Sequence, residues 1–170
     1  MPGTSLRIER VLTLLAETPT RIAAFTADLE PEELQMRPTP DEWSANEVLA
    51  HLRACADVWG NSIMTILSKD QPTWRAVSPR TWIKQTNYPE LAFQPSLDAF
   101  TKQRADLLAV LSLLPVDAWE RSAHVSMVGK VLERTVLSYA ERLVVHEKSH
   151  IKQIAGIADT MHMRKGSEDG

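Results

Sequence analysis

Apolar side chains recur every three or four residues along four stretches of the chain, which is the spacing expected of amphipathic helices. These stretches cover residues 5–29, 44–67, 96–114 and 131–159. Thr18-Pro19 interrupts the first stretch, so we expect two pieces that act together as one kinked helix. Alternating patterns of the kind that mark strands are almost absent. The pattern therefore predicts an all-α fold, a four-helix bundle.

Two long segments connect the predicted helices. Residues 68–95 lack a sustained period, and they contain several prolines and several aromatic residues. A crossover of this length lets the second and third helices run parallel, and we expect its aromatic side chains to pack on the bundle or to cover a site. Residues 115–130 are expected to form a second connector.

The apolar face of the last predicted helix continues into two histidines. Steps of three and four residues lead from Leu132 through Val136, Tyr139 and Leu143 to His146 and then His150. Residues four apart lie on the same face of a helix, so both rings can reach one metal ion. A buried polar ring must be paired or bound, and neutral imidazole is a good ligand for zinc, nickel, iron or copper. The spacing favours metal binding over two separately satisfied core histidines.

A third ligand has to come from another part of the chain. His51 lies beside the apolar face of the second predicted helix, and we choose it for this reason. Three histidines leave at least one coordination position for water, as in catalytic rather than structural zinc sites.

The segment from His146 to His150 also matches His-Glu-x-x-His, the motif of zinc proteases, in which Glu147 is the general base. The further histidine of metzincins is absent, because Gly156 stands at its position. The downstream glutamate of other zinc proteases is available only as Glu168, near the end of the chain. We therefore rank a protease last, and we expect Glu147 to face solvent.

Four other residues are weaker candidates for the site. Glu47 has the spacing from Ser44 of a capping box, and the alternative is a hydrogen bond to a ligand histidine. Cys55, one turn beyond His51, either faces the metal or is inert filler. Arg104 either binds a substrate carboxylate or extends to solvent. His124 lies in a connector. It is either outside the site or enters the site from outside as a proton carrier.

Composition narrows the class of protein. The 170 residues are enough for one domain, expected over 1–163 with a frayed tail over 164–170. The formal net charge is -3 and no Lys/Arg-rich cluster occurs, so nothing favours nucleic acid or an anionic membrane as a partner. No apolar run approaches the ~20 residues that span a bilayer. A lone cysteine and an N-terminal segment without the apolar stretch of a signal peptide lead us to expect a cytoplasmic protein.

Two motifs together resemble the DinB/YfiT-like superfamily of four-helix metalloproteins. They are Trp-Ser-x-x-Glu-x-x-x-His-Leu over residues 43–52 and His-x-x-x-His over residues 146–150. The resemblance implies a divalent metal held by His51, His146 and His150. We expect zinc or nickel ahead of iron or manganese. The resemblance also implies a homodimer, and it does not imply DNA binding. Better-understood members of the family are thiol-dependent transferases or isomerases that use low-molecular-weight thiols such as bacillithiol or mycothiol.

Three functions then compete. The first is a metal-dependent enzyme, a thiol S-transferase or a related hydrolase or isomerase. The second is a non-catalytic metal-binding protein of the stress response, in which the ion fastens the second and last helices together. The third is the zinc protease. An exchangeable water beside an accessible pocket favours catalysis, whereas a fourth protein ligand favours a structural site.

Overall fold

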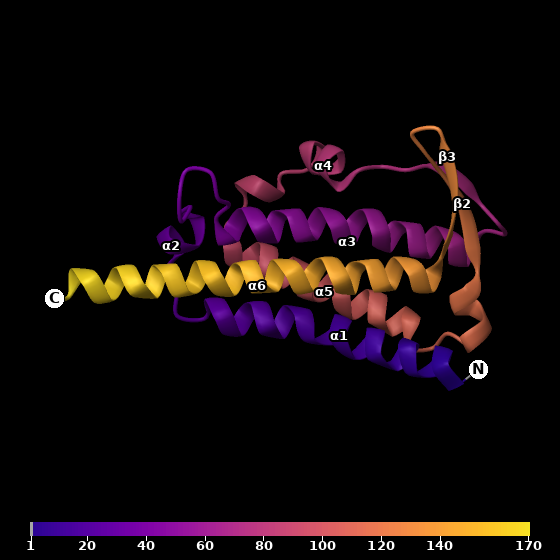
Figure 1. Cartoon of the computed structure of the whole chain (residues 1–170), viewed down its shortest axis with the longest axis horizontal. Helices are drawn as coiled ribbons and strands as arrows, with labels where there is room; N and C mark the ends of the chain where they lie inside the picture. Colours follow the sequence, from indigo (N-terminus) through magenta and orange to yellow (C-terminus); the bar gives the residue numbers. More distant parts are fainter. Residues whose placement is uncertain (1) are drawn as a thin grey trace.

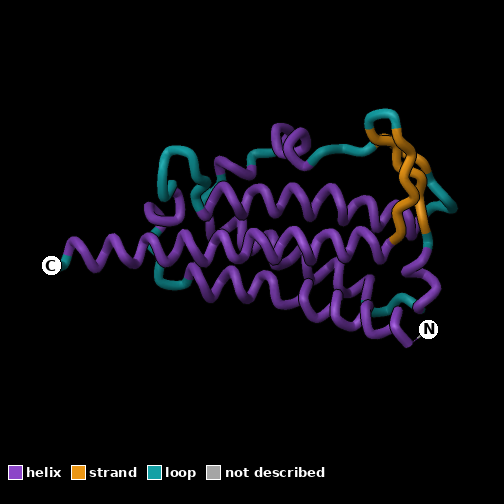
Figure 2. Tube along the Cα trace, viewed as in Figure 1, coloured by secondary structure: helices purple, strands orange, loops and turns teal. Residues whose placement is uncertain are grey.

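The computed structural model describes residues 2–170, and four long helices lie side by side along its longest axis (Figures 1 and 2). They are α1 (Pro2–Thr26), α3 (Ala45–Ser68), α5 (Phe93–Leu111) and α6 (Val136–Glu168). Helices α1 and α3 each pack against both α5 and α6, which closes the bundle. Figure 1 shows α3 and α5 running in the same direction, opposite to α1 and α6. The predicted parallel pair and its long crossover are therefore present.

Helix α1 continues through Pro19 as one element. A proline inside a helix leaves the carbonyl four residues earlier without its usual amide donor. Here that carbonyl belongs to Leu15, and it accepts a hydrogen bond of 3.0 Å from the buried Arg104 of α5. The donor that Pro19 removes is thus replaced by a side chain from another helix.

Helix α3 begins with the predicted capping box. The Glu47 backbone N–H donates to the Ser44 hydroxyl at 3.1 Å, and the Ser44 backbone N–H donates to the Glu47 carboxylate at 2.8 Å. Arg37, which follows the short helix α2 (Pro31–Gln35), also donates to Glu47. The Glu47 carboxylate therefore accepts its hydrogen bonds from Ser44 and Arg37, and the alternative of a hydrogen bond to a ligand histidine is not realised.

The crossover from α3 to α5 is bound to the bundle by one carboxylate. It contains β1 (Thr73–Arg75), α4 (Pro79–Trp82) and two 3-10 turns, η1 (Ile83–Gln85) and η2 (Tyr88–Glu90). Asp57 of α3 accepts hydrogen bonds from the Trp82 indole at 3.0 Å and from the Tyr88 hydroxyl at 2.6 Å. Gln103 of α5 donates to its other oxygen at 2.8 Å. Two aromatic residues of the crossover are therefore held against the bundle.

A small sheet corrects the all-α prediction. After the 3-10 turn η3 (Val116–Glu120), β2 (Ser122–Met127) and β3 (Lys130–Thr135) form an antiparallel hairpin, and β1 pairs parallel to β2. Gly129 allows the tight turn, because its φ of 74° is one that other residues rarely adopt. The predicted connector of 115–130 is thus partly strand, and residues 131–135 belong to β3 rather than to the last helix. Thr135 caps α6, which begins at Val136.

The C-terminal end of α6 is longer than predicted. The helix continues to Glu168, beyond the expected end at residue 159 and through most of the expected frayed tail. Its last turns contact the segment that follows α1: Nε2 of His162 lies 2.8 Å from the Asp28 carboxylate, and Lys165 forms an ion pair with Glu33 at 3.0 Å. None of the helices in residues 2–170 combines the length and the apolar character needed to cross a bilayer.

Buried apolar residues form two cores, one toward the sheet and one toward the α2 end of the bundle. Between them, each long helix contributes a buried polar residue: Thr18, His51, Arg104 and Glu147. This set, which we call the polar layer, lies next to the candidate site.

Candidate metal centre

Three imidazole rings meet between α3 and α6. The Nε2 atom of His146 lies 2.9 Å from Nε2 of His51 and 3.1 Å from Nε2 of His150. The ring centroids of the three pairs are 4.5 to 5.1 Å apart. The structure thus brings together the three residues that the sequence predicts as metal ligands, with one nitrogen of each ring directed at a common point.

Neighbouring side chains orient these rings. The Nδ1 atom of His150 lies 2.8 Å from the Gln153 side-chain oxygen, which can only accept. When neutral, His150 therefore carries its proton on Nδ1 and presents a lone pair at Nε2. Trp43 packs on the rings of His51 and His150, and Trp59 meets His146 edge to face with centroids 5.1 Å apart. The rings are held by packing and hydrogen bonding before any ligand binds.

Burial keeps two of the rings neutral. Desolvation lowers the pKa of His51 to about 4, with the neighbouring His150 and His146 as the next causes. Desolvation and then His150 lower the pKa of His146 to about 4. At neutral pH both rings are therefore uncharged, which is the form that binds a metal.

The donor set fits a transition metal. With its proton on Nδ1, His150 offers only a lone pair at Nε2. A single proton on Nε2 of His146 cannot form good hydrogen bonds to Nε2 of both His51 and His150, which lie 2.9 and 3.1 Å away. A cation satisfies all three lone pairs at once. Ligand nitrogens at about 2.0–2.1 Å from a tetrahedral zinc ion lie about 3.4 Å apart, so small outward movements of the rings would admit the ion.

Cys55 lies beside the same point. Its Sγ atom is 3.5 Å from Nε2 of His51, and the ligand atoms of His51, Cys55 and His146 all lie within 4.8 Å of one another. Burial, and then the negative charge of Glu147, raises the pKa of the thiol to about 12. Without a metal the thiol is thus protonated and inert, whereas coordination would make it a thiolate.

Replacing Cys55 with alanine distinguishes its two roles. With three imidazoles as the ligands, the variant should keep nearly the wild-type zinc content, measured by elemental analysis after dialysis against zinc-free buffer. A loss of zinc as large as that caused by removing one histidine would instead identify Cys55 as a ligand and the centre as a closed, structural one.

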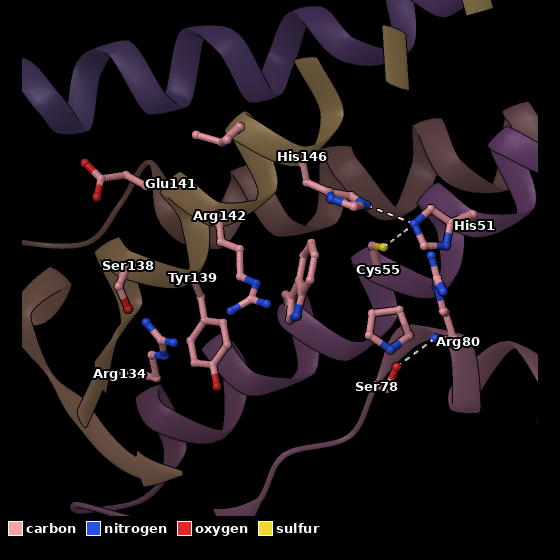
Figure 3. Close-up of a pocket in the computed structure, with 13 residues that line it drawn as sticks. His51, Cys55, Ser78, Arg80, Arg134, Ser138, Tyr139, Glu141, Arg142 and His146 are labelled. Carbon is pink, nitrogen blue, oxygen red and sulfur yellow. Dashed lines mark hydrogen bonds between the residues drawn. The ribbon is translucent and has the colours of Figure 1, made fainter. Parts of the chain in front are cut away.

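A cavity of about 520 Å³ opens onto this cluster (Figure 3). His51, Cys55, Trp59 and His146 form one wall, and residues of α4, β3 and the first turns of α6 form the others. Its volume lies in the range of small-molecule sites. His51, Cys55 and His146 are thus accessible to a small molecule, whereas His150 does not line the cavity.

Glu147 and Arg104 lie where the sequence did not predict them. Both side chains are only 2% exposed, and the guanidinium donates to both carboxylate oxygens, at 2.8 and 2.5 Å. Thr18 donates to the same carboxylate at 2.9 Å. Glu147 therefore does not face solvent, and Arg104 neither extends to solvent nor is available to a substrate. The carboxylate that a zinc protease would use as general base is engaged within the bundle.

His124 lies away from the centre. It is an exposed residue of β2, paired across the hairpin with Glu133, and it does not line the cavity. Of the two alternatives for His124, the structure therefore favours the position outside the site over the proton carrier.

Three arginines that sequence reasoning missed do line the cavity: Arg80, Arg134 and Arg142. Arg142 precedes His146 by one helical turn, and this spacing was the only signal in the sequence that could have found it.

A sequence model of the DinB superfamily matches residues 14–154, a span that includes all three clustered histidines. The chain belongs to the DinB superfamily. Among solved structures it is similar to YfiT from Bacillus subtilis, described as a probable metal-dependent hydrolase with an unusual four-helix bundle topology. The TM-score is 0.74 at 18% identity, over 91% of this chain and 87% of YfiT. No curated protein sequence matches the chain. This DinB-superfamily protein therefore shares the YfiT fold.

Proposed function

We propose that this DinB-superfamily protein is a metal-dependent enzyme acting on a small molecule, with a divalent transition metal, zinc or nickel, held by His51, His146 and His150. One observation carries the proposal: three imidazole nitrogens converge on one point, and two of these residues, His51 and His146, line a cavity large enough for a substrate. Histidines that only pack in a core or only face solvent need neither to direct their nitrogens at one point nor to lie beside a cavity.

A bound metal of this kind supplies Lewis acidity, which makes a bound water or thiol a better nucleophile near neutral pH. The chain's own residues prepare the site around it. Gln153 holds the tautomer of His150, and Trp59 excludes water from one side of His146. Tyr139 lines the cavity, and because burial raises its pKa, the phenol stays protonated and can donate a hydrogen bond to a substrate.

We infer thiol S-transfer with a low-molecular-weight thiol as the reaction, and hydrolysis as the second candidate. The family resemblance supports the first. The description of YfiT, which shares the fold, supports the second. The non-catalytic alternative has one observation in its favour, the position of Cys55 next to His51, which offers a fourth ligand.

The test compares zinc-loaded, nickel-loaded and chelator-treated protein. Conjugation of bacillithiol or mycothiol to a bimane electrophile measures transfer, and cleavage of a p-nitrophenyl ester measures hydrolysis. We expect at least one rate to depend on the metal and to fall about tenfold or more in His51→Ala. The control is His124→Ala, which removes an exposed imidazole and should leave the rate unchanged. Metal binding without any metal-dependent rate would favour the non-catalytic alternative.

A further inference from the structure

The cavity beside the metal centre is lined by guanidinium groups from three separate elements. Arg80 comes from α4, Arg134 from β3 and Arg142 from α6. Within residues 2–170, no ion pair involves any of these three side chains. Three positive charges thus surround one hollow without acidic partners.

The acidic residue of the cavity does not neutralise them. Glu141 lines the same hollow, but its carboxylate accepts three hydrogen bonds from Arg7 of α1. Figure 3 shows Glu141 directed away from Arg134 and Arg142. The chain as a whole has a net charge of -3, so this concentration of positive charge is local and is not a consequence of composition.

An adjoining hollow of about 350 Å³ extends the positive region. It shares Trp59, Tyr139, Arg134 and Arg142 with the first cavity and adds Arg75 of β1. Among the residues that the structure describes, no acidic one lines it. The two hollows together therefore form one cationic cleft that ends at the histidine cluster.

Arg142 connects the cleft to the metal centre. It precedes His146 by four residues on α6, so the two side chains lie on one face about 5–6 Å apart at their Cβ atoms. The Trp59 ring lies 4.9 Å below the Arg142 guanidinium and also packs on His146. Arg142 is thereby positioned to hold one end of a small molecule whose other end reaches the histidines.

We propose that the cleft binds the oxyanion group of an anionic small molecule, a carboxylate or a phosphate, through Arg142 and Arg134, with Arg80 contributing beside His51. Guanidinium groups suit this chemistry because their planar donors match two oxygens at once. The proposal names the substrate class and in that respect rests on the proposed function, although binding of the anion itself does not require the metal. An oxyanion held at Arg142 places the rest of the substrate within reach of the histidine cluster.

The test uses metal-free protein, since carboxylates and phosphates also bind metal ions. Isothermal titration with succinate and, separately, with inorganic phosphate measures binding and distinguishes the two anions; neutral succinamide serves as the blank. We expect at least one anion to bind, and the affinity to fall about tenfold in Arg142→Gln and in Arg134→Gln, as expected for the loss of a charge-assisted hydrogen bond. Lys130→Gln is the matched control, because it removes a charge from the same strand as Arg134 but outside the cleft.

Several outcomes would overturn the proposal: no binding of either anion to the wild-type protein, unchanged affinity in the arginine variants, or an equal loss in Lys130→Gln. If a glutamine variant fails to fold by circular dichroism, Arg142→Lys replaces it, with a smaller loss expected because the charge remains and the two-pronged contact does not. The same titration of His146→Ala separates the two proposals. If His146→Ala still binds the anion and the wild-type protein shows no metal-dependent rate, the proposal of an anion-binding cleft stands and the proposed enzymatic function is refuted.

Discussion

Replacing His146 with alanine should lower the bound zinc or nickel by about tenfold or more. His146 is the central ring, because its Nε2 atom lies near both other nitrogens, whereas His51 and His150 each contact it from one side. Removing it leaves two imidazoles without their shared neighbour. Elemental analysis gives the metal content, and titration with zinc gives the affinity.

Thermal unfolding adds a second measure of the same prediction. A metal present at 100 times its dissociation constant stabilises the folded state by about 2.7 kcal/mol. Wild-type protein should therefore lose stability when a chelator is added, and His146→Ala should not respond to it. His124→Ala, which removes an exposed histidine outside the cavity, should behave like the wild type. Full metal occupancy in His146→Ala would show that the clustered rings are not the binding site.

The second large effect is expected from Glu147→Gln, which should destabilise the fold by about 3–5 kcal/mol. The substitution keeps the shape of the side chain but leaves the Arg104 guanidinium buried without a counter-charge. Metal content should change little, since the carboxylate is directed at Arg104 and Thr18 rather than at the histidine nitrogens. Urea unfolding at equilibrium measures the loss as a shift in midpoint without a change in slope.

A matched control exists on the same helix. Glu141 forms a comparable ion pair with Arg7, but both side chains are partly exposed, so Glu141→Gln should cost no more than about 1 kcal/mol. Joint replacement, Arg104→Met with Glu147→Leu, should recover part of the loss, because no buried charge remains. Recovery should be incomplete, since Arg104 also donates to the Leu15 carbonyl that Pro19 leaves free. A cost below 1 kcal/mol for Glu147→Gln would contradict this account.

Local signals in the sequence predicted the features that depend on neighbouring residues. The start of α3 follows from Ser44 and Glu47, which lie three residues apart and whose side chains each accept a hydrogen bond from the other's backbone N–H. The meeting of His146 with His150 follows from helical spacing alone. His51 was located by its place on an apolar face, and it reached the cluster because α3 and α6 pack together.

Features that depend on distant partners were missed. Glu147 looked exposed because its position is one residue off the apolar stripe, yet its partner Arg104 is 43 residues away. The hairpin was missed because buried Ala123 and Val125 give only a brief alternation, and because Leu132 continues the helical spacing of α6 backward into β3. Pairing of β1 with β2 is set by a contact between residues about 50 positions apart, which no local pattern encodes.

The polar layer also determines how the helices are aligned along the bundle axis. Sliding α6 by one turn, about 5.4 Å, would carry Glu147 out of reach of Thr18 and Arg104 and leave its charge among Leu or Ile side chains. The apolar cores on either side would tolerate such a slip far better, because one aliphatic contact resembles another. The salt-bridged Glu147 carboxylate therefore fixes the position of α6 along the bundle axis. In that position, His146 and His150 lie level with His51.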